Sequence, residues 1–248
     1  MDDRAIDEMA AFEDRHWWFI GKRLLVVALL GDRATRPGLR VLDVGCGTGG
    51  VLAHLRDGGA ATVGVDRSLQ ALRHCRARGI PALACADMDR LPFAAARFDV
   101  VLMLDVLEHF VDDGAVVARA RTLLRPGGAL LVSVPAFQAL FSEHDRAVAH
   151  VRRYSAPQLR TVLEGGGFAV RRLTYTNVAA FPPAAVLRGL LPRLGLDRGP
   201  GTDFREHAPW VNRLLVGTYE AEAAVLRRGG RLPVGLSVAA LAEPTPDH

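Results

Sequence analysis

Between residues 37 and 135, short apolar runs alternate with longer stretches that carry apolar residues on one helical face. The run at 98–104 is apolar along almost its whole length, as expected of a strand covered on both faces. Helices are predicted between the strands, with Ser68 and Asp112 as N-caps. The strands are predicted at 40–44, 62–65, 82–86, 98–104 and 129–134, and the helices at 49–56, 69–78 and 113–124. This alternation indicates an α/β fold built on a doubly wound, mostly parallel sheet.

The segments on either side of this unit follow other patterns. Residues 1–36 are predicted to form an N-terminal helical lid, and residues 37–176 the α/β core with a further strand at 168–176. Residues 177–235 contain several prolines and are too long for a sheet connection. They are therefore predicted to be a helical insertion that covers one end of the sheet as a cap over the substrate. Residues 236–248 are expected to hold the final strand, at 236–241, and a tail.

Composition and charge exclude several classes of protein. Half of the residues are hydrophobic and 23% are charged, which is enough to bury a sizeable core. The net charge of +4 is spread along the chain without a basic block that contains aromatic residues, so we expect no nucleic-acid partner. Cys46, Cys75 and Cys85 lack the spacing of a disulfide framework or a zinc site, and we predict no metal.

The apolar segments are too short to cross a membrane. No run approaches the roughly 18 residues of a spanning helix. The acidic first segment lacks the basic-then-apolar pattern of a signal peptide. We therefore expect a cytoplasmic protein without stable membrane insertion, as a monomer or a homodimer.

A glycine loop follows the first predicted strand, in the sequence VLDVGCGTGG. Such a loop makes a tight turn and lets a ligand approach the backbone at a helix N-terminus. Gly45, Gly47 and Gly50 match the dinucleotide fingerprint, which suggests an NAD-dependent oxidoreductase. Asp43, two residues before the first glycine, disfavours a pyrophosphate and suits a ligand with an ammonium or sulfonium group. Both interpretations remain open at this point.

Further acids follow the next strands. Asp66 ends the second strand, where a carboxylate can accept both hydroxyls of a ribose. Asp87 ends the third and can accept from an exocyclic amine, and Met88 can pack against a purine. The segment 104–109 follows the fourth strand. All of these residues are predicted at the carboxyl edge of the sheet, where open α/β sheets bind their ligands.

Taken together, the segments VLDVGCGTGG, VGVDRS, ACADMDRLPFAAARFDVVLMLDVLEHF and LRPGGALLVSVPAF resemble the class I S-adenosylmethionine (SAM)-dependent methyltransferases of the small-molecule type. The resemblance implies a seven-stranded Rossmann-like sheet whose last strand is antiparallel. It implies SAM as the cofactor and S-adenosylhomocysteine (SAH) as the product. The methionine part would lie against Asp43 and the loop, the ribose against Asp66, the adenine against Arg67, Asp87 and Met88, and the methyl donor near Leu104 and His109. The loop residues in this set are Gly45, Cys46, Gly47 and Gly49.

Histidines are the first candidates for removing a proton from an acceptor, because their pKa lies close to neutrality. We predict His150, then His144, then His109 as the catalytic residue. Trp17, Trp18, Arg153 and Tyr154 are predicted to contact the acceptor. The structural alternative is that the aromatic residues anchor the first helices and that 144–154 is a network that anchors its loop.

The acceptor is expected to be a small lipophilic or aromatic molecule. After the fourth strand the chain lacks the Asn/Asp-Pro-Pro-Tyr/Phe motif that, in the family it resembles, accompanies methylation of planar nitrogens. Oxygen is therefore the favoured acceptor atom, with nitrogen and carbon open. A protein that binds SAM without catalysis is a further alternative.

Overall fold

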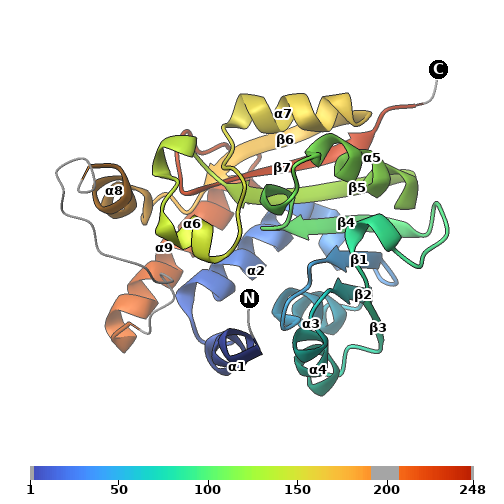
Figure 1. Ribbon diagram of the computed structural model, residues 1–248, viewed down its shortest axis with the longest axis horizontal. Coiled ribbons are helices and arrows are strands. Elements are labelled where there is room, and N and C mark those ends of the chain that lie inside the picture. The colour runs from blue at the N-terminus through green and yellow to red at the C-terminus, as the bar shows by residue number, and fades with distance from the viewer. Residues whose placement is uncertain (1–2, 191–206, 247–248) are drawn as a thin grey trace.

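The computed structural model describes residues 3–190 and 207–246 and contains a seven-stranded sheet flanked by helices (Figure 1). The strand order is β3-β2-β1-β4-β5-β7-β6, and β7 runs antiparallel to both of its neighbours. This arrangement confirms the seven-stranded, doubly wound sheet with an antiparallel last strand. The strands are β1 (Arg40–Val44), β2 (Ala61–Asp66), β3 (Ala82–Cys85), β4 (Phe98–Leu104), β5 (Leu124–Pro135), β6 (Phe168–Thr176) and β7 (Ser237–Pro244).

Two strands are longer than the apolar pattern indicates. β5 begins at Leu124, because that residue pairs with Phe98 across an irregularity in the ladder. β7 extends to Pro244, which pairs with Phe168 at the far end of β6. These residues take their strand conformation from a neighbouring strand, which local hydrophobic periodicity does not report.

Helices cover both faces of the sheet, and each face has its own apolar cluster. α5 and α7 pack over one face through residues such as Val117 and Leu163. α2 and α9 pack over the other face through residues such as Leu29 and Leu226. The helices are α1 (Asp3–Phe12), α2 (Trp17–Leu30), α3 (Gly50–Asp57), α4 (Leu69–Ala77), α5 (Asp113–Leu123), α6 (Glu143–Ala147), α7 (Ala156–Gly165), α8 (Phe181–Ala184) and α9 (Pro209–Arg227).

The N-terminal segment and the segment before β7 pack against each other, although they lie far apart in sequence. The Tyr219 ring of α9 lies on the backbone of Gly21 in α2, so closely that a Cβ at Gly21 would lie 2.4 Å from it. Asn212 accepts a hydrogen bond from the backbone N–H of Trp17 at 2.8 Å. α2 and α9 are thus held together as one layer on their face of the sheet.

The predicted insertion 177–235 is helical in its described parts, which include α8 and α9, while 191–206 lies outside the described residues. α8 and α6 lie beyond the carboxyl ends of β4 and β5 (Figure 1). Within 3–190 and 207–246, none of the helices is both long and apolar enough to cross a membrane.

Candidate active site

A cavity of about 1430 Å³ lies at the carboxyl ends of β1, β2 and β4 and is also lined by α1 and α2. The strand order reverses between β1 and β4, and such a switch point is the usual ligand site of an open α/β sheet. Most of the residues predicted from the sequence are brought together in its wall: Trp17, Trp18, Asp43, Gly45, Cys46, Gly47, Asp66, Arg67, Asp87, Met88, Leu104, His109, His144, His150 and Arg153. Gly49 and Tyr154 are the predicted residues that do not line it.

The glycine loop connects β1 to α3 and forms part of the cavity floor. The N–H groups of Gly45 and Cys46 both donate to the Val65 carbonyl, at 2.8 and 3.0 Å, which ties the loop to β2. Gly45 has φ +71°, and a Cβ there would lie 2.6 Å from the Val106 side chain. Gly49, at φ +86°, packs on Cys75 instead of facing the cavity. It therefore shapes the turn from outside the cavity wall.

Asp66 holds the glycine loop in place from the end of β2. Its carboxylate accepts hydrogen bonds from the N–H of Gly47 at 2.9 Å and of Ser68 at 2.8 Å. Each carboxylate oxygen can accept more than one hydrogen bond, so Asp66 can still bind a hydroxyl from the cavity side. The same side chain therefore links loop geometry to any ligand bound there.

Asp43 is a buried carboxyl group in the cavity wall. The residue is 3% exposed and its Oδ1 atom has no hydrogen-bond partner. Burial, together with the charges of Asp66 and Glu13, raises the pKa of Asp43 to about 8, and Lys22 opposes this shift. A cation placed beside Asp43 would stabilise its ionised form.

Asp87, Met88 and Arg67 lie at the edge of the cavity formed by the ends of β2 and β3. Met88 is buried, and Asp87 accepts a hydrogen bond from its N–H at 2.7 Å. The Asp87 side chain remains 44% exposed, and the Arg67 guanidinium lies 3.9 Å from it. The Arg67 side chain is 77% exposed, which leaves it free to move toward a ligand.

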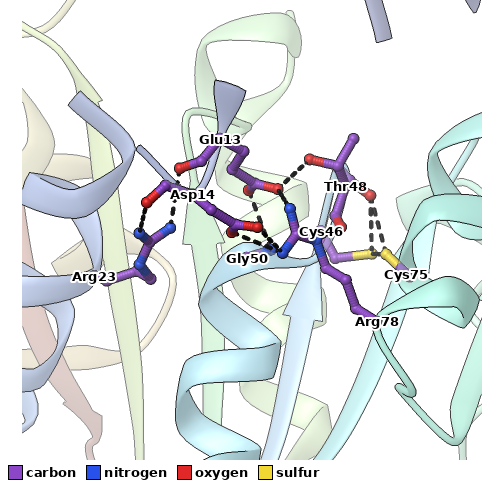
Figure 2. A network of polar contacts seen from close by, with 9 residues as sticks. Glu13, Asp14, Arg23, Cys46, Thr48, Gly50, Cys75 and Arg78 are labelled. Atoms are coloured by element: carbon purple, nitrogen blue, oxygen red, sulfur yellow. Dashed lines mark hydrogen bonds and ion pairs between the residues drawn. The ribbon is translucent and has the colours of Figure 1, made fainter. Parts of the chain in front are cut away.

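A network of polar contacts fastens the end of α1 to the glycine loop and α3 (Figure 2). Glu13 is buried, and its carboxylate accepts hydrogen bonds from the Thr48 hydroxyl and, at 3.1 Å, from the N–H of Gly50. Arg78 donates to Glu13 at 3.0 Å and to Asp14 at 2.7 Å. Glu13 therefore occupies the positive N-terminal end of α3, where a carboxylate is stabilised.

Lys22 of α2 reaches the cavity as well. Its ammonium group forms an ion pair with Asp105, which follows β4 with φ +56°. The same ammonium lies 4.5 Å from the centre of the Trp18 ring, within the range of a cation–π contact. The N-terminal helices thus supply charge to the site as well as apolar cover.

His150 lies in a chain of buried polar groups after β5. Its Nδ1 is 2.9 Å from Asp145, which also accepts two hydrogen bonds from the Arg153 guanidinium, at 2.8 and 2.9 Å. Burial alone would raise the pKa of Asp145, but the hydrogen bonds from His150 and Arg153 outweigh it and hold that pKa well below its usual range. Because Asp145 is ionised, Nδ1 of His150 carries the proton and Nε2 is the free ring atom.

The other two histidines and Glu108 surround His150. The His109 and His150 rings are 4.9 Å apart, and the His144 and His150 rings are 6.5 Å apart. Burial, with a contribution from Arg188, lowers the pKa of His144 to about 4, and burial also lowers the pKa of His109. Burial and the nearby Asp105 raise the pKa of Glu108. All three histidines predicted from the sequence are therefore brought to one end of the cavity.

Arg153 lines the cavity with its guanidinium bound to Asp145, whereas Tyr154 does not line the cavity. The Arg153 guanidinium is 97% buried and donates hydrogen bonds to Asp145. Tyr154 is buried, and its hydroxyl donates to Asp113 at 2.8 Å outside the cavity wall. Tyr154 therefore anchors the loop, in agreement with the structural alternative, because Asp113 at the start of α5 satisfies its hydroxyl.

Comparisons with known proteins agree with this geometry. Residues 42–132 match the methyltransferase domain family. Residues 42–132 are therefore a methyltransferase domain of the SAM-dependent kind. A ubiquinone biosynthesis O-methyltransferase from Hahella chejuensis is 31% identical over 144 residues, which are 52% of this chain and 60% of the relative. A demethylmenaquinone methyltransferase from Corynebacterium kroppenstedtii is 35% identical over 115 residues, 44% of this chain and 50% of the relative.

The likeness of the methyltransferase fold extends beyond the matched domain. A chain of the complex between the Haloferax volcanii Trm112 methyltransferase activator and a methyltransferase superposes with a TM-score of 0.62 at 20% identity, covering 99% of this chain and 96% of that chain. These two curated relatives are matched over only 60% and 50% of their own length. The family match decides between the two interpretations of the glycine loop in favour of SAM.

Three residues in or beside the cavity were not among the site residues predicted from the sequence. Glu13 accepts a hydrogen bond from Gly50 after the glycine loop, Lys22 forms an ion pair with Asp105, and Asp145 binds His150. Lys22 had one signal, because it is the only lysine of the chain and follows the aromatic cluster. Glu13 lies among other acids and had no distinguishing pattern, whereas Asp145 lies within the segment 144–154, whose polar residues were expected to form a network.

Proposed function

We propose that this chain transfers the methyl group of SAM to an oxygen atom of a small lipophilic or aromatic acceptor. The strongest support for this proposal is that one cavity contains both a candidate cofactor site and a candidate proton-transfer site. One end has the glycine loop and the acids Asp43 and Asp66, and the other has the carboxylate and histidines around His150. The relatives described as O-methyltransferases support oxygen as the acceptor atom.

The residues of the cavity fit SAM. The unpartnered oxygen of Asp43 is the group expected beside the ammonium of the methionine part. Asp66 would bind the ribose hydroxyls, and Asp87 with Met88 would hold the adenine, with Arg67 at the exposed edge. Gly45, Cys46 and Gly47 let the ligand approach the backbone. Leu104 and His109 line the part of the cavity where the methyl group of SAM would lie.

The acceptor side is lined by apolar groups from two segments. Trp17 and Trp18 come from α2, and Ala180, Pro183 and Leu187 come from the insertion around α8. Such a wall favours a lipophilic or aromatic molecule over a highly charged one. The helical segments before and after the core would therefore act as lid and cap over the acceptor.

SAM supplies an electrophilic methyl group on a sulfonium that is a good leaving group. The protein's remaining tasks are to align the acceptor oxygen opposite the sulfur and to help its hydroxyl lose a proton. His150 is the central residue for the second task, because Asp145 fixes its ring and leaves Nε2 facing the cavity end. His109 and Glu108 flank that atom.

The first test is calorimetric titration with SAH, with NADH as the control ligand. Binding of SAH alone supports the cofactor assignment. Binding of NADH alone would contradict it. A panel of phenols, catechols, hydroxyquinones and amines is then incubated with SAM labelled in its methyl group, and the labelled products are identified.

The role of the histidine cluster is tested with His150→Ala. We expect turnover to fall by roughly 10²-fold or more, the usual contribution of a proton-transfer group, with SAH affinity unchanged. His54→Ala, an exposed histidine on α3 outside the cavity, is the matched control and should retain full turnover. Equal turnover of both variants would remove His150 from the reaction.

A further inference from the structure

Glu108 is a buried carboxylate whose oxygens accept no hydrogen bond from the other side chains within 3–190 and 207–246. The residue is 0% exposed, and both of its carboxylate oxygens lack a hydrogen-bond partner there. Burying such a group without a partner is costly. Nε2 of His150 lies 3.7 Å from Glu108 Oε1, which is too far for a hydrogen bond. Glu108 nevertheless belongs to the wall of the cavity.

Two histidines lie beside this carboxylate, and each uses its Nδ1 for another partner. Nδ1 of His150 is held by Asp145 at 2.9 Å, and Nδ1 of His109 is 3.1 Å from the Ala149 carbonyl. Both acceptors require the proton on Nδ1, so each Nε2 carries a lone pair. Metal-binding histidines show this pattern, in which a carboxylate or a carbonyl holds the ring atom that does not bind the metal.

The three side chains are close enough to share one ion. One potential ligand atom of each residue lies within 4.8 Å of those of the other two. Metal–ligand distances of about 2.1 Å place neighbouring ligand atoms roughly 3–4 Å apart, so the 3.7 Å between Glu108 and His150 already fits. Only small side-chain movements are needed to complete the set.

We propose that Glu108, His109 and His150 bind one divalent transition-metal cation at the acceptor end of the cavity. Two imidazoles and one carboxylate suit Zn²⁺, Fe²⁺, Co²⁺ or Mn²⁺. Mg²⁺ and Ca²⁺ prefer oxygen ligands and fit less well. This proposal replaces the prediction, made from the sequence, that the protein binds no metal.

The consequence for catalysis rests on the proposed function. Three protein ligands leave coordination positions open toward the cavity, where an acceptor hydroxyl can bind. The cation lowers the pKa of that hydroxyl, and its proton passes to solvent. The oxygen then forms a bond to the methyl carbon as the carbon–sulfur bond breaks, which gives a methyl ether and SAH. His150 thus takes part as a ligand that positions the cation.

The test is direct metal binding by the whole chain after treatment with EDTA and dialysis. Zn²⁺ binding is measured by calorimetry, and Co²⁺ binding by its visible absorption, which reports the ligand geometry. We expect one ion per chain, and a loss of affinity of roughly 100-fold or more in Glu108→Gln and in His109→Asn. His74→Ala, which removes a surface histidine–carboxylate pair with Asp7, is the control and should bind as the wild type does.

Folding of the variants is checked by SAH affinity. Glu108→Gln removes an unpartnered buried carboxylate, so it should fold at least as stably as the wild type. Equal metal affinity of Glu108→Gln and the wild type would overturn the site, as would no binding of Zn²⁺, Co²⁺, Mn²⁺ or Fe²⁺ by a protein that binds SAH. Metal binding without methyl transfer to any hydroxyl acceptor would leave the site in place and count against the proposed function.

Discussion

The buried carboxyl of Asp43 makes SAH binding depend on pH. Its pKa of about 8 lies roughly four units above the ordinary value of 3.8, and at about 1.4 kcal/mol per unit this amounts to roughly 6 kcal/mol of bias toward the neutral form. About one carboxyl in a hundred is then ionised at pH 6, and about one in ten at pH 7. Because the ligand's ammonium group favours the ionised form, SAH binding should release about one proton in this range.

The expected affinity for SAH rises about tenfold from pH 6 to pH 7, about fivefold more to pH 8, and levels off above pH 8. Calorimetry in two buffers of different ionisation enthalpy measures both the affinity and the released proton. Adenosine, which has no ammonium group, should show a flat profile. Asp43→Asn should bind SAH more weakly at pH 8 and lose the pH dependence. Equal affinity of the wild type at pH 6 and pH 8, with no proton released, would refute the reasoning.

The same pKa has a consequence for stability. The folded state binds the Asp43 proton more tightly than the unfolded state does, so its contribution to the free energy of unfolding falls as the pH rises from about 4 to about 8. SAH should counteract that loss.

Three further substitutions probe the loop, the lid and the histidine cluster. Asp66→Asn should weaken SAH binding by about 10- to 100-fold in calorimetry, because one backbone N–H of the site loses its acceptor. Glu13→Gln should lower the free energy of unfolding in urea by about 1–3 kcal/mol, whereas the exposed Glu8→Gln should change it by less than about 0.5 kcal/mol. Asp145→Asn leaves a buried guanidinium without its charge partner and should cost about 3 kcal/mol, against less than about 1 kcal/mol for the exposed Glu143→Gln.

The local pattern of apolar and polar residues was sufficient to predict most of the fold. The bounds of β1, β4 and β6 agree with the predicted strands, because buried strands carry their apolar residues consecutively in sequence. Ser68 and Asp112 cap α4 and α5 as expected, since capping depends on neighbours along the chain. The carboxyl-edge location of the ligand site follows from topology alone.

The candidate site could be predicted only in its local parts. Asp43 and Asp66 follow from motif spacing, because both lie at the ends of adjacent strands. Lys22 and Asp105 are 83 residues apart and meet only through the packing of α2 over the sheet. His150 and Glu108 meet because a loop after β5 folds back over the end of β4. Contacts of this kind depend on tertiary packing, for which the sequence has no local signal.

Under the proposed function, in which both ends of the chain cover the acceptor, the packing of Tyr219 on Gly21 constrains how the substrate can change. The first helices and the helix before β7 share one interface, so a change in one must be matched by a change in the other. The matched domain, 42–132, includes neither of them. A designer who wished to exchange acceptor specificity would therefore transplant both ends of the chain as a single cassette and leave the cofactor-binding middle intact.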